Sequence, residues 1–179
     1  MKVFKIFYIP IILLFVCSSI KSNAQSSFPE GWLDDWKGKL IIYSENNVKQ
    51  EVTMELNIRN TDTDGHWKWI IIYGTGEFRQ ERHYELMLID SVKGKYKMDE
   101  KNSIILDMTY ANNTFYSTFN VDKNLITAIY RLENKKIYFE IISSDMKSPL
   151  VTGQESEDIS IVESYPVNVT QRAVLTISN

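Results

Sequence analysis

Apolar and polar residues alternate along residues 51–59. The apolar set is Val52, Met54, Leu56 and Ile58. A period of two places the members of such a set on one face of an extended strand, so the segment predicts a half-buried β-strand. A turn cluster, Thr61-Asp62-Thr63-Asp64-Gly65, comes next, and a second long strand is predicted over residues 67–73. One face of this second strand carries Trp67, Trp69, Ile71 and Tyr73.

Short turn signals divide most of the remaining chain into segments of about ten residues, a spacing typical of antiparallel meanders, sandwiches and barrels. Examples are Lys93-Gly94 and Asn112-Asn113. Further strands are predicted at residues 39–44, 79–89, 94–99, 103–110, 114–121, 125–132, 136–143, 159–165 and 167–177. Residues 144–158 are polar, contain Pro149 and Gly153, and are expected to form a surface loop.

Ten or so strands joined by short connections either stack as two sheets or close on themselves, and closure removes the exposed sheet edges. Ser27-Phe28-Pro29-Glu30 has the pattern of a helix capping box and predicts a short helix over residues 28–35. A helical cap before the first strand favours the barrel. We therefore expect an all-β protein, an antiparallel up-and-down β-barrel of about ten strands with a short N-terminal helix.

Two short segments resemble the calycins, the superfamily of lipocalins and fatty-acid-binding proteins. Trp32-Leu33-Asp34-Asp35-Trp36-Lys37-Gly38 is similar to the calycin opening, in which a short helix leads to a tryptophan that closes one barrel end. The glycine two residues before this tryptophan in lipocalins is Asp34 here. The resemblance implies a calycin-like barrel, with Arg172 on the last strand stacked over Trp36.

The first 24 residues have the pattern of a secretory signal peptide. Lys2 and Lys5 precede an apolar run from Ile6 to Val16, and Ser22-Asn23-Ala24 supplies a cleavage site. We expect export to the periplasm or the medium, with residues 25–179 forming one domain and no stable membrane insertion after cleavage. Lipidation of Cys17, the only cysteine, is the alternative, although Val16 is bulky for the residue before a lipidated cysteine.

Composition narrows the function classes. The chain is 44% hydrophobic and 24% charged, which excludes a disordered chain. Loss of residues 1–24 removes three of the 20 basic residues and none of the 23 acidic ones, so the remaining formal charge is about −6. This sign is wrong for binding nucleic acid, and no nucleic-acid partner is expected.

Candidate catalytic chemistry is sparse. The two histidines, His66 and His83, form no His-x-His or HExxH motif, and no nucleophile elbow, P-loop or dinucleotide fingerprint occurs. We predict solvated surface histidines, no metal site, no catalytic residues and no cofactor.

The segment 79–90 is the most informative for binding. Gln80, Arg82, Tyr84, Leu86 and Leu88 share one face. If this face is internal, Arg82 and Tyr84 are polar groups in an apolar cavity, a pattern that suits a ligand with a hydrocarbon body and a polar head. The alternatives are that Arg82 lies at a solvent-exposed rim, or that it pairs with an acid such as Glu140.

Three function classes follow from this pattern. The first is a carrier of a small apolar or amphipathic ligand, for which the candidate ligand-binding residues are Arg82, Tyr84, Trp67, Trp69 and Tyr73. The second is a structural or interaction module whose interior is filled by side chains, since the chain is 12% aromatic. The third is a barrel enzyme of unknown reaction.

Overall fold

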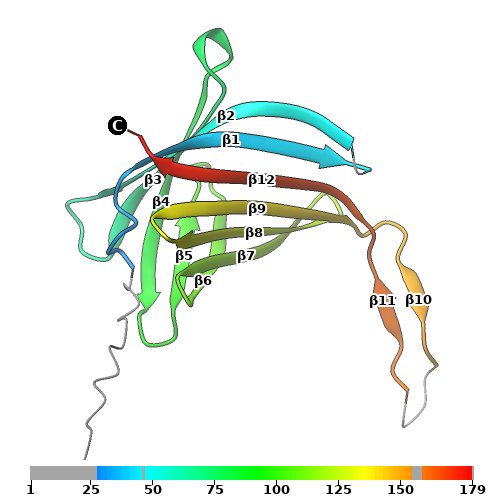
Figure 1. Ribbon diagram of the computed structural model, residues 1–179. Coiled ribbons are helices and arrows are strands. Elements are labelled where there is room, and N and C mark those ends of the chain that lie inside the picture. The colour runs from blue at the N-terminus through cyan, green and yellow to red at the C-terminus, as the bar shows by residue number, and fades with distance from the viewer. Residues whose placement is uncertain (1–27, 46, 155–158, 179) are drawn as a thin grey trace, which may run out of the picture.

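Ten antiparallel strands close into a single barrel (Figure 1). The computed structural model describes residues 28–45, 47–154 and 159–178. The barrel strands are β1 (Asp35–Ser44), β2 (Asn47–Asn60), β3 (His66–Tyr73), β4 (Gln80–Asp90), β5 (Lys95–Asp99), β6 (Ile105–Ala111), β7 (Thr114–Val121), β8 (Asn124–Glu133), β9 (Lys136–Asp145) and β12 (Val167–Ile177). The order around the barrel is β1-β12-β9-β8-β7-β6-β5-β4-β3-β2, so most neighbours are consecutive in sequence. The predicted all-β, up-and-down barrel of about ten strands is confirmed.

Closure depends on the last strand. β12 pairs with β9 on one side and with β1 on the other, from Trp36 opposite Ile177 to Ser44 opposite Val169. The two backbones approach closely at Gly38, where an added Cβ would lie 2.2 Å from the Val174 carbonyl oxygen. Glycine is therefore required here by the packing of β1 against β12.

The segment between β9 and β12 differs from the prediction. Residues 144–158 were expected to form a loop and residues 159–165 a strand of the main sheet; instead β10 (Leu150–Thr152) and β11 (Val162–Ser164) pair with each other. This two-stranded hairpin projects from the barrel (Figure 1). β9 and β12 already pair with each other, which leaves no place for another strand between them.

The predicted helix over residues 28–35 is also wrong for the described residues. Residues 28–32 are turns, with the Trp32 amide donating to the Pro29 carbonyl at 3.0 Å, and β1 starts at Asp35. Phe28 and Trp32 both turn into the barrel and are buried. Gly31 has a φ of 77°, in the left-handed region that a right-handed helix cannot include, so the chain turns here instead of continuing as a helix.

Residues 1–24, the predicted signal peptide, lie outside the described residues. Within the described part, no helix is long and apolar enough to span a membrane.

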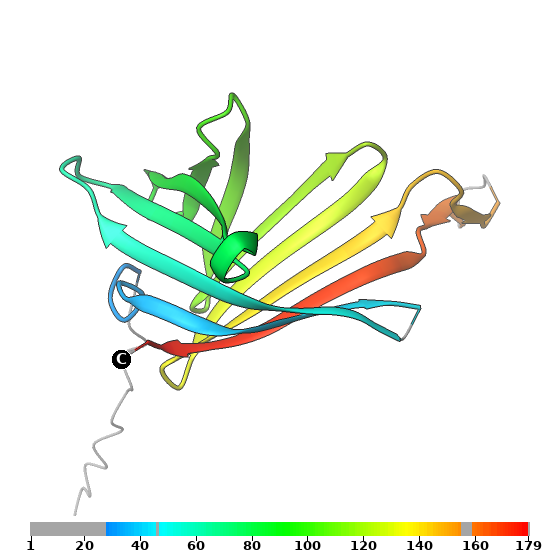
Figure 2. The ribbon, with the colours of Figure 1, turned by 90° about the horizontal axis from the view of Figure 1, so that it is seen from above.

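The core is concentrated at the end of the barrel where the described chain begins and ends, which we call the closed end (Figures 1 and 2). Aromatic rings meet there mostly edge to face; Phe115 has its ring centroid 5.0 Å from that of Phe28 and 5.3 Å from that of Trp32. The inward alternation predicted for β2 is confirmed, because Met54, Leu56 and Ile58 are completely buried. The fully buried aromatic side chains are Trp32, Trp36, Trp69 and Phe115.

The Trp36–Arg172 pair implied by the calycin resemblance is absent. Trp36 is buried, and its indole nitrogen donates to the Trp32 carbonyl at 2.8 Å. Arg172 lies opposite Ile41, five residues along β1 from Trp36, or roughly 16 Å at the rise of a strand. Its side chain is exposed and pairs with Glu140 at 2.8 Å. The hydrogen-bonded ladder between β1 and β12, rather than a cation–π contact, closes the barrel.

Candidate ligand-binding cavity

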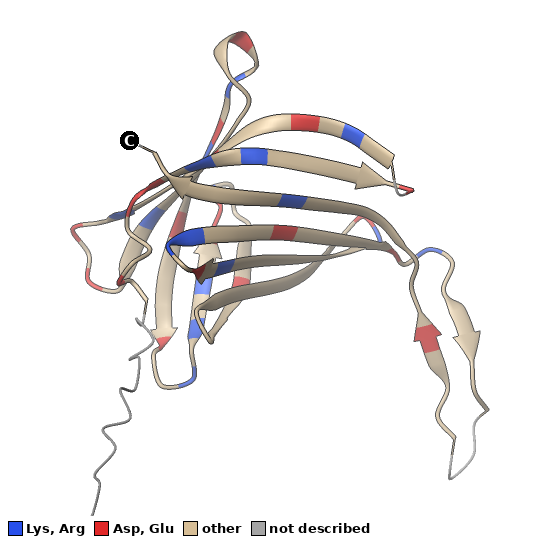
Figure 3. Cartoon of the chain, viewed as in Figure 1, with Lys and Arg blue, Asp and Glu red and all other residues tan. Residues whose placement is uncertain are grey.

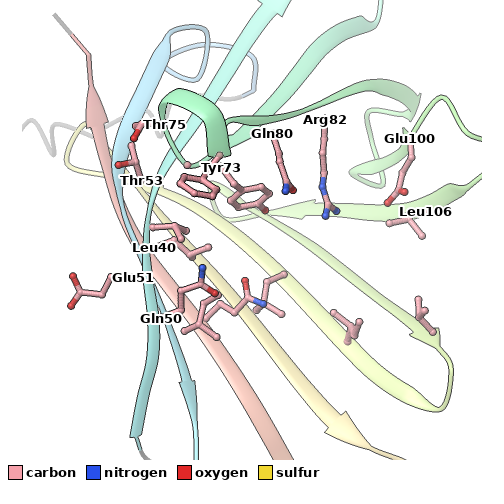
Figure 4. Close-up of a pocket in the computed structure, with 18 of the residues that line it drawn as sticks. Leu40, Gln50, Glu51, Thr53, Tyr73, Thr75, Gln80, Arg82, Glu100 and Leu106 are labelled. Atoms are coloured by element: carbon pink, nitrogen blue, oxygen red, sulfur yellow. The ribbon is translucent and has the colours of Figure 1, made fainter.

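The opposite end of the barrel is hollow. A cavity of about 930 Å³ opens there, and its wall is built from the strand ends farthest from the aromatic cluster (Figure 4). Its apolar lining includes Leu40, Ile42, Val52, Tyr73, Leu106, Phe119, Ile126 and Ile141. Its polar lining includes Gln50, Gln80, Arg82, Glu100 and Gln171.

The predicted binding residues lie at different distances from the open end of the barrel, so only some of them reach the cavity. Trp69 lies opposite Tyr84, Ile71 opposite Arg82 and Tyr73 opposite Gln80, so the predicted inward faces of β3 and β4 do meet. Tyr73 and Arg82 line the cavity.

Trp67 and Trp69, by contrast, belong to the packed cluster at the closed end and do not line the cavity. The structure therefore does not bring these two predicted residues to the cavity. Alternation identifies which face of a strand is internal, whereas depth along the barrel axis depends on the register of all ten strands.

Arg82 is exposed at the open end, and its side chain projects from β4 toward the cavity (Figure 4). The guanidinium carbon lies 5.6 Å from the centre of the Tyr73 ring, and one guanidinium nitrogen donates to the Tyr84 hydroxyl at 3.5 Å. This hydrogen bond raises the pKa of Arg82 above its usual value, so the group stays charged. Of the positions considered from sequence, the solvent-exposed rim is the one that the structure shows, although the Arg82 side chain also contributes to the cavity lining.

The chain has five arginines, and four of them form ion pairs: Arg59 with Asp35, Arg79 with Glu81, Arg131 with Glu133, and Arg172 with Glu140. Within the described residues, no carboxylate lies within 4.0 Å of Arg82. Glu140, the partner considered from sequence, faces outward and pairs with Arg172 instead. Arg82 therefore forms no ion pair within the described part of the protein, although Glu100 lines the same cavity and its charge helps to raise the pKa of Arg82.

Two tyrosines support this arginine. Tyr84 is half-buried, packs against the core and contacts Arg82 through its hydroxyl, although it does not line the cavity itself. Burial raises the pKa of the Tyr73 hydroxyl, while the neighbouring guanidinium acts in the opposite direction. The Tyr73 hydroxyl is therefore neutral at physiological pH and can donate or accept hydrogen bonds.

Three glutamines in the wall were not predicted. Gln50 and Gln171 both flank Ile42, on β2 and β12, and Gln80 lies on β4 beside Tyr73. Gln80 shares the predicted inward face of its strand, so the alternation could have identified it. Gln50 lies one residue before the segment 51–59, and extending the alternating pattern would have included it.

The two histidines lie on the outer surface and contact glutamates, His66 with Glu85 and His83 with Glu81. Across the described residues, no three potential metal ligands of the His, Cys, Asp and Glu types are grouped. Acidic and basic residues are interspersed along the barrel strands (Figure 3). Several of them pair across adjacent strands, for example Lys37 with Glu55 and Lys39 with Glu51.

Comparison with known proteins adds information on the fold. No protein-family model matches the chain, and no curated protein matches it. Among solved structures, it is similar to the S-type phycobiliprotein lyase CPES from Guillardia theta, with a TM-score of 0.58 over 84% of this chain and 90% of the lyase. The fold is a lipocalin-like barrel. Sequence identity with the lyase is only 9%, so the similarity concerns the fold alone.

Proposed function

We propose that this protein binds a small amphipathic ligand with an anionic head, the hydrocarbon part in the barrel cavity and the head at Arg82. The observation that carries the proposal is that Arg82, alone among five arginines, has no carboxylate partner in the described part of the chain and extends toward an apolar cavity. A carboxylate would supply the missing partner through charge-assisted hydrogen bonds.

The cavity is suited to such a ligand in size and lining. Its volume of about 930 Å³ lies within the range of small-molecule sites, about 300–1,000 Å³. Each buried methylene would contribute about 0.8 kcal/mol, so affinity for the tail would come from the apolar wall. Specificity for the head would come from Arg82 and the three glutamines at the open end.

The alternative of a structural or interaction module requires an interior filled by side chains, and only half of the barrel is filled in this way. Aromatic side chains fill the closed end, but the open half retains the cavity, which a purely structural module does not need. The similar fold of a phycobiliprotein lyase supports a barrel of this type as the framework of a functional site. The enzyme alternative has no specific side-chain constellation in its favour, and we do not propose a reaction.

Arg82→Leu tests the proposal with two probes that share one chain, hexadecanoate and the neutral hexadecanol. A charge-assisted hydrogen bond is worth about 1.5–3 kcal/mol, so the substitution should weaken hexadecanoate binding about tenfold or more and leave hexadecanol unaffected. Arg79→Leu is the matched control, because Arg79 pairs with Glu81 and does not line the cavity. Equal losses for both probes, or no hexadecanoate binding by the unmodified protein, would contradict the proposal.

We also propose that the protein is exported. The support is the signal-peptide pattern of residues 1–24 and the absence of cysteine after Cys17.

A further inference from the structure

The barrel wall has an opening between two neighbouring strands. β6 and β7 pair only near the closed end, from Ala111 opposite Thr114 to Thr109 opposite Tyr116. β7 is paired with β8 along its whole length, so the missing pairs belong to the β6 side alone. Seen from above, β7 (yellow-green) diverges from the green strands beside it (Figure 2).

A side chain replaces the backbone ladder at the point of divergence. Beyond Thr109 and Tyr116, the Ser117 hydroxyl donates to the Asp107 carbonyl at 2.7 Å. Past this bond, residues 118–121 of β7 have no strand partner on the β6 side. Apart from the Asp107 carbonyl, which accepts from Ser117, the backbone of the two edges is not paired across the opening and could form a ladder.

The two edges also form part of the cavity wall. Ile104 and Leu106 line the cavity from the β6 side, and Phe119 and Val121 line it from the β7 side. Both unpaired edges therefore contribute apolar side chains to the cavity.

The existing register, if extended, would close this opening with matching side chains. It would place Leu106 opposite Phe119 and Ile104 opposite Val121, two apolar pairs on the inner face. Asp107 and Thr118 would form the intervening pair on the outer face. The alternation of both strands thus suits a longer ladder than the one present.

Arg82 lines the same cavity from β4, on the other side of β5 and β6. β5 pairs with β4 only between Glu85 and Asp90, so the segment of β4 from Gln80 to Tyr84 has β3 alone as its neighbour. A ligand that passed between β6 and β7 would contact the apolar side chains of the two edges first and would then reach the guanidinium across the cavity.

We propose that the amphipathic ligand enters the cavity through the opening between β6 and β7, and that the two strands then pair over it. The inference rests on the proposed function, since it assigns an entry route to the same site. Burial of the hydrocarbon tail against Leu106 and Phe119 would favour the paired state, which also satisfies the free backbone groups.

A disulfide across the opening tests the route. Asp107→Cys and Thr118→Cys, in a Cys17→Ser background, would be directly opposite each other on the outer surface only when the ladder is extended. Thr109→Cys and Tyr116→Cys form the control pair, because they are already opposite and lie on the same outer face. Oxidation is followed with and without hexadecanoate, and uptake and release are followed by stopped-flow displacement of a fluorescent fatty acid.

We expect hexadecanoate to accelerate oxidation of the 107–118 pair at least tenfold and to leave the control pair unchanged. The oxidised, empty protein should take up hexadecanoate at least tenfold more slowly, and protein oxidised after loading should release it at least tenfold more slowly. Reduction should restore both rates. In the protein without new cysteines, hexadecanoate should slow amide hydrogen exchange at residues 118–121, a measurement that does not depend on the variants.

The outcomes separate the two proposals. Normal uptake by the oxidised 107–118 variant would show that the ligand enters at the open end of the barrel, which overturns the side route and leaves the proposed function intact. Unchanged exchange at residues 118–121 in ligand-saturated protein would overturn the pairing step. Absence of any hexadecanoate binding would overturn the proposed function and, with it, this inference.

Discussion

At the level of single residues, the position of an inward-facing side chain along its strand decides whether it packs in the core or lines the cavity. Phe115 and Phe119 illustrate this, because both lie on β7 and differ by four residues. Phe115 is completely buried among Phe28, Trp32 and other rings of the closed end. Phe119 is half-buried and lines the cavity. The same side chain therefore contributes to stability at one level of the barrel and to a candidate site at another.

Alanine substitutions at these two phenylalanines should affect different quantities, the stability of the barrel at Phe115 and the affinity for ligand at Phe119. Phe115→Ala removes a ring from the packed cluster and should cost about 3–5 kcal/mol of unfolding free energy. Phe119→Ala should cost less stability but weaken hexadecanoate binding about fivefold, because about 1 kcal/mol of apolar contact would be lost. Chemical denaturation and calorimetric titration measure the two quantities. If Phe119→Ala left the affinity unchanged, the cavity wall would not be the site of the tail.

At the level of elements, β9 and β12 form an uninterrupted part of the barrel although residues 146–166 separate them in sequence. Val167 pairs with Ser144, and the Asp145 amide donates to the Pro166 carbonyl at 3.0 Å. The intervening hairpin pairs only with itself among the described strands, and Leu150 and Val151 are exposed. The barrel therefore does not need the hairpin for closure.

Replacement of residues 147–164 by Asn-Gly should leave the barrel intact. Because the described hairpin strands add no ladder to the barrel, we expect a change below about 1 kcal/mol, or a melting temperature within about 4 °C of the parent. Differential scanning calorimetry measures this, and hexadecanoate titration checks the cavity. A fall of 10 °C or more would show that the hairpin stabilises the barrel through contacts outside the pairing described above.

At the level of the whole molecule, the barrel has two unlike halves. One is filled by aromatic side chains, and the other contains a cavity lined by Arg82, which forms no ion pair within the described residues. Such an arrangement lets a protein of this size keep a stable core while leaving room for a ligand. An exported carrier would also need to fold without disulfides, since the only cysteine is Cys17.

The export proposal predicts the N-terminus of the mature protein. Cleavage after Ala24 would leave Gln25 as the first residue, which N-terminal sequencing of protein recovered from the periplasm or medium can check. Ala24→Arg should block cleavage and provides a matched control. A mature chain that begins with lipid-modified Cys17 would instead place the protein on a membrane.

The sequence by itself determined the strand content, the antiparallel class and the internal faces of β2, β3 and β4. These are local properties, because alternation with a period of two is imposed by the pleat of each strand. The same alternation selected Arg82 and Tyr73, which do lie in the cavity wall.

Only the tertiary structure decided which internal residues pack and which line the cavity. Trp69 and Tyr73 have the same sequence pattern, yet one is in the aromatic cluster and the other faces the ligand space. The tertiary structure also decided that Arg172 pairs with Glu140, while the Trp36 indole donates to the Trp32 carbonyl. It decided as well that β6 and β7 diverge after a few pairs. Depth, partners and gaps depend on the register between strands distant in sequence, and no local pattern in one strand encodes the position of another.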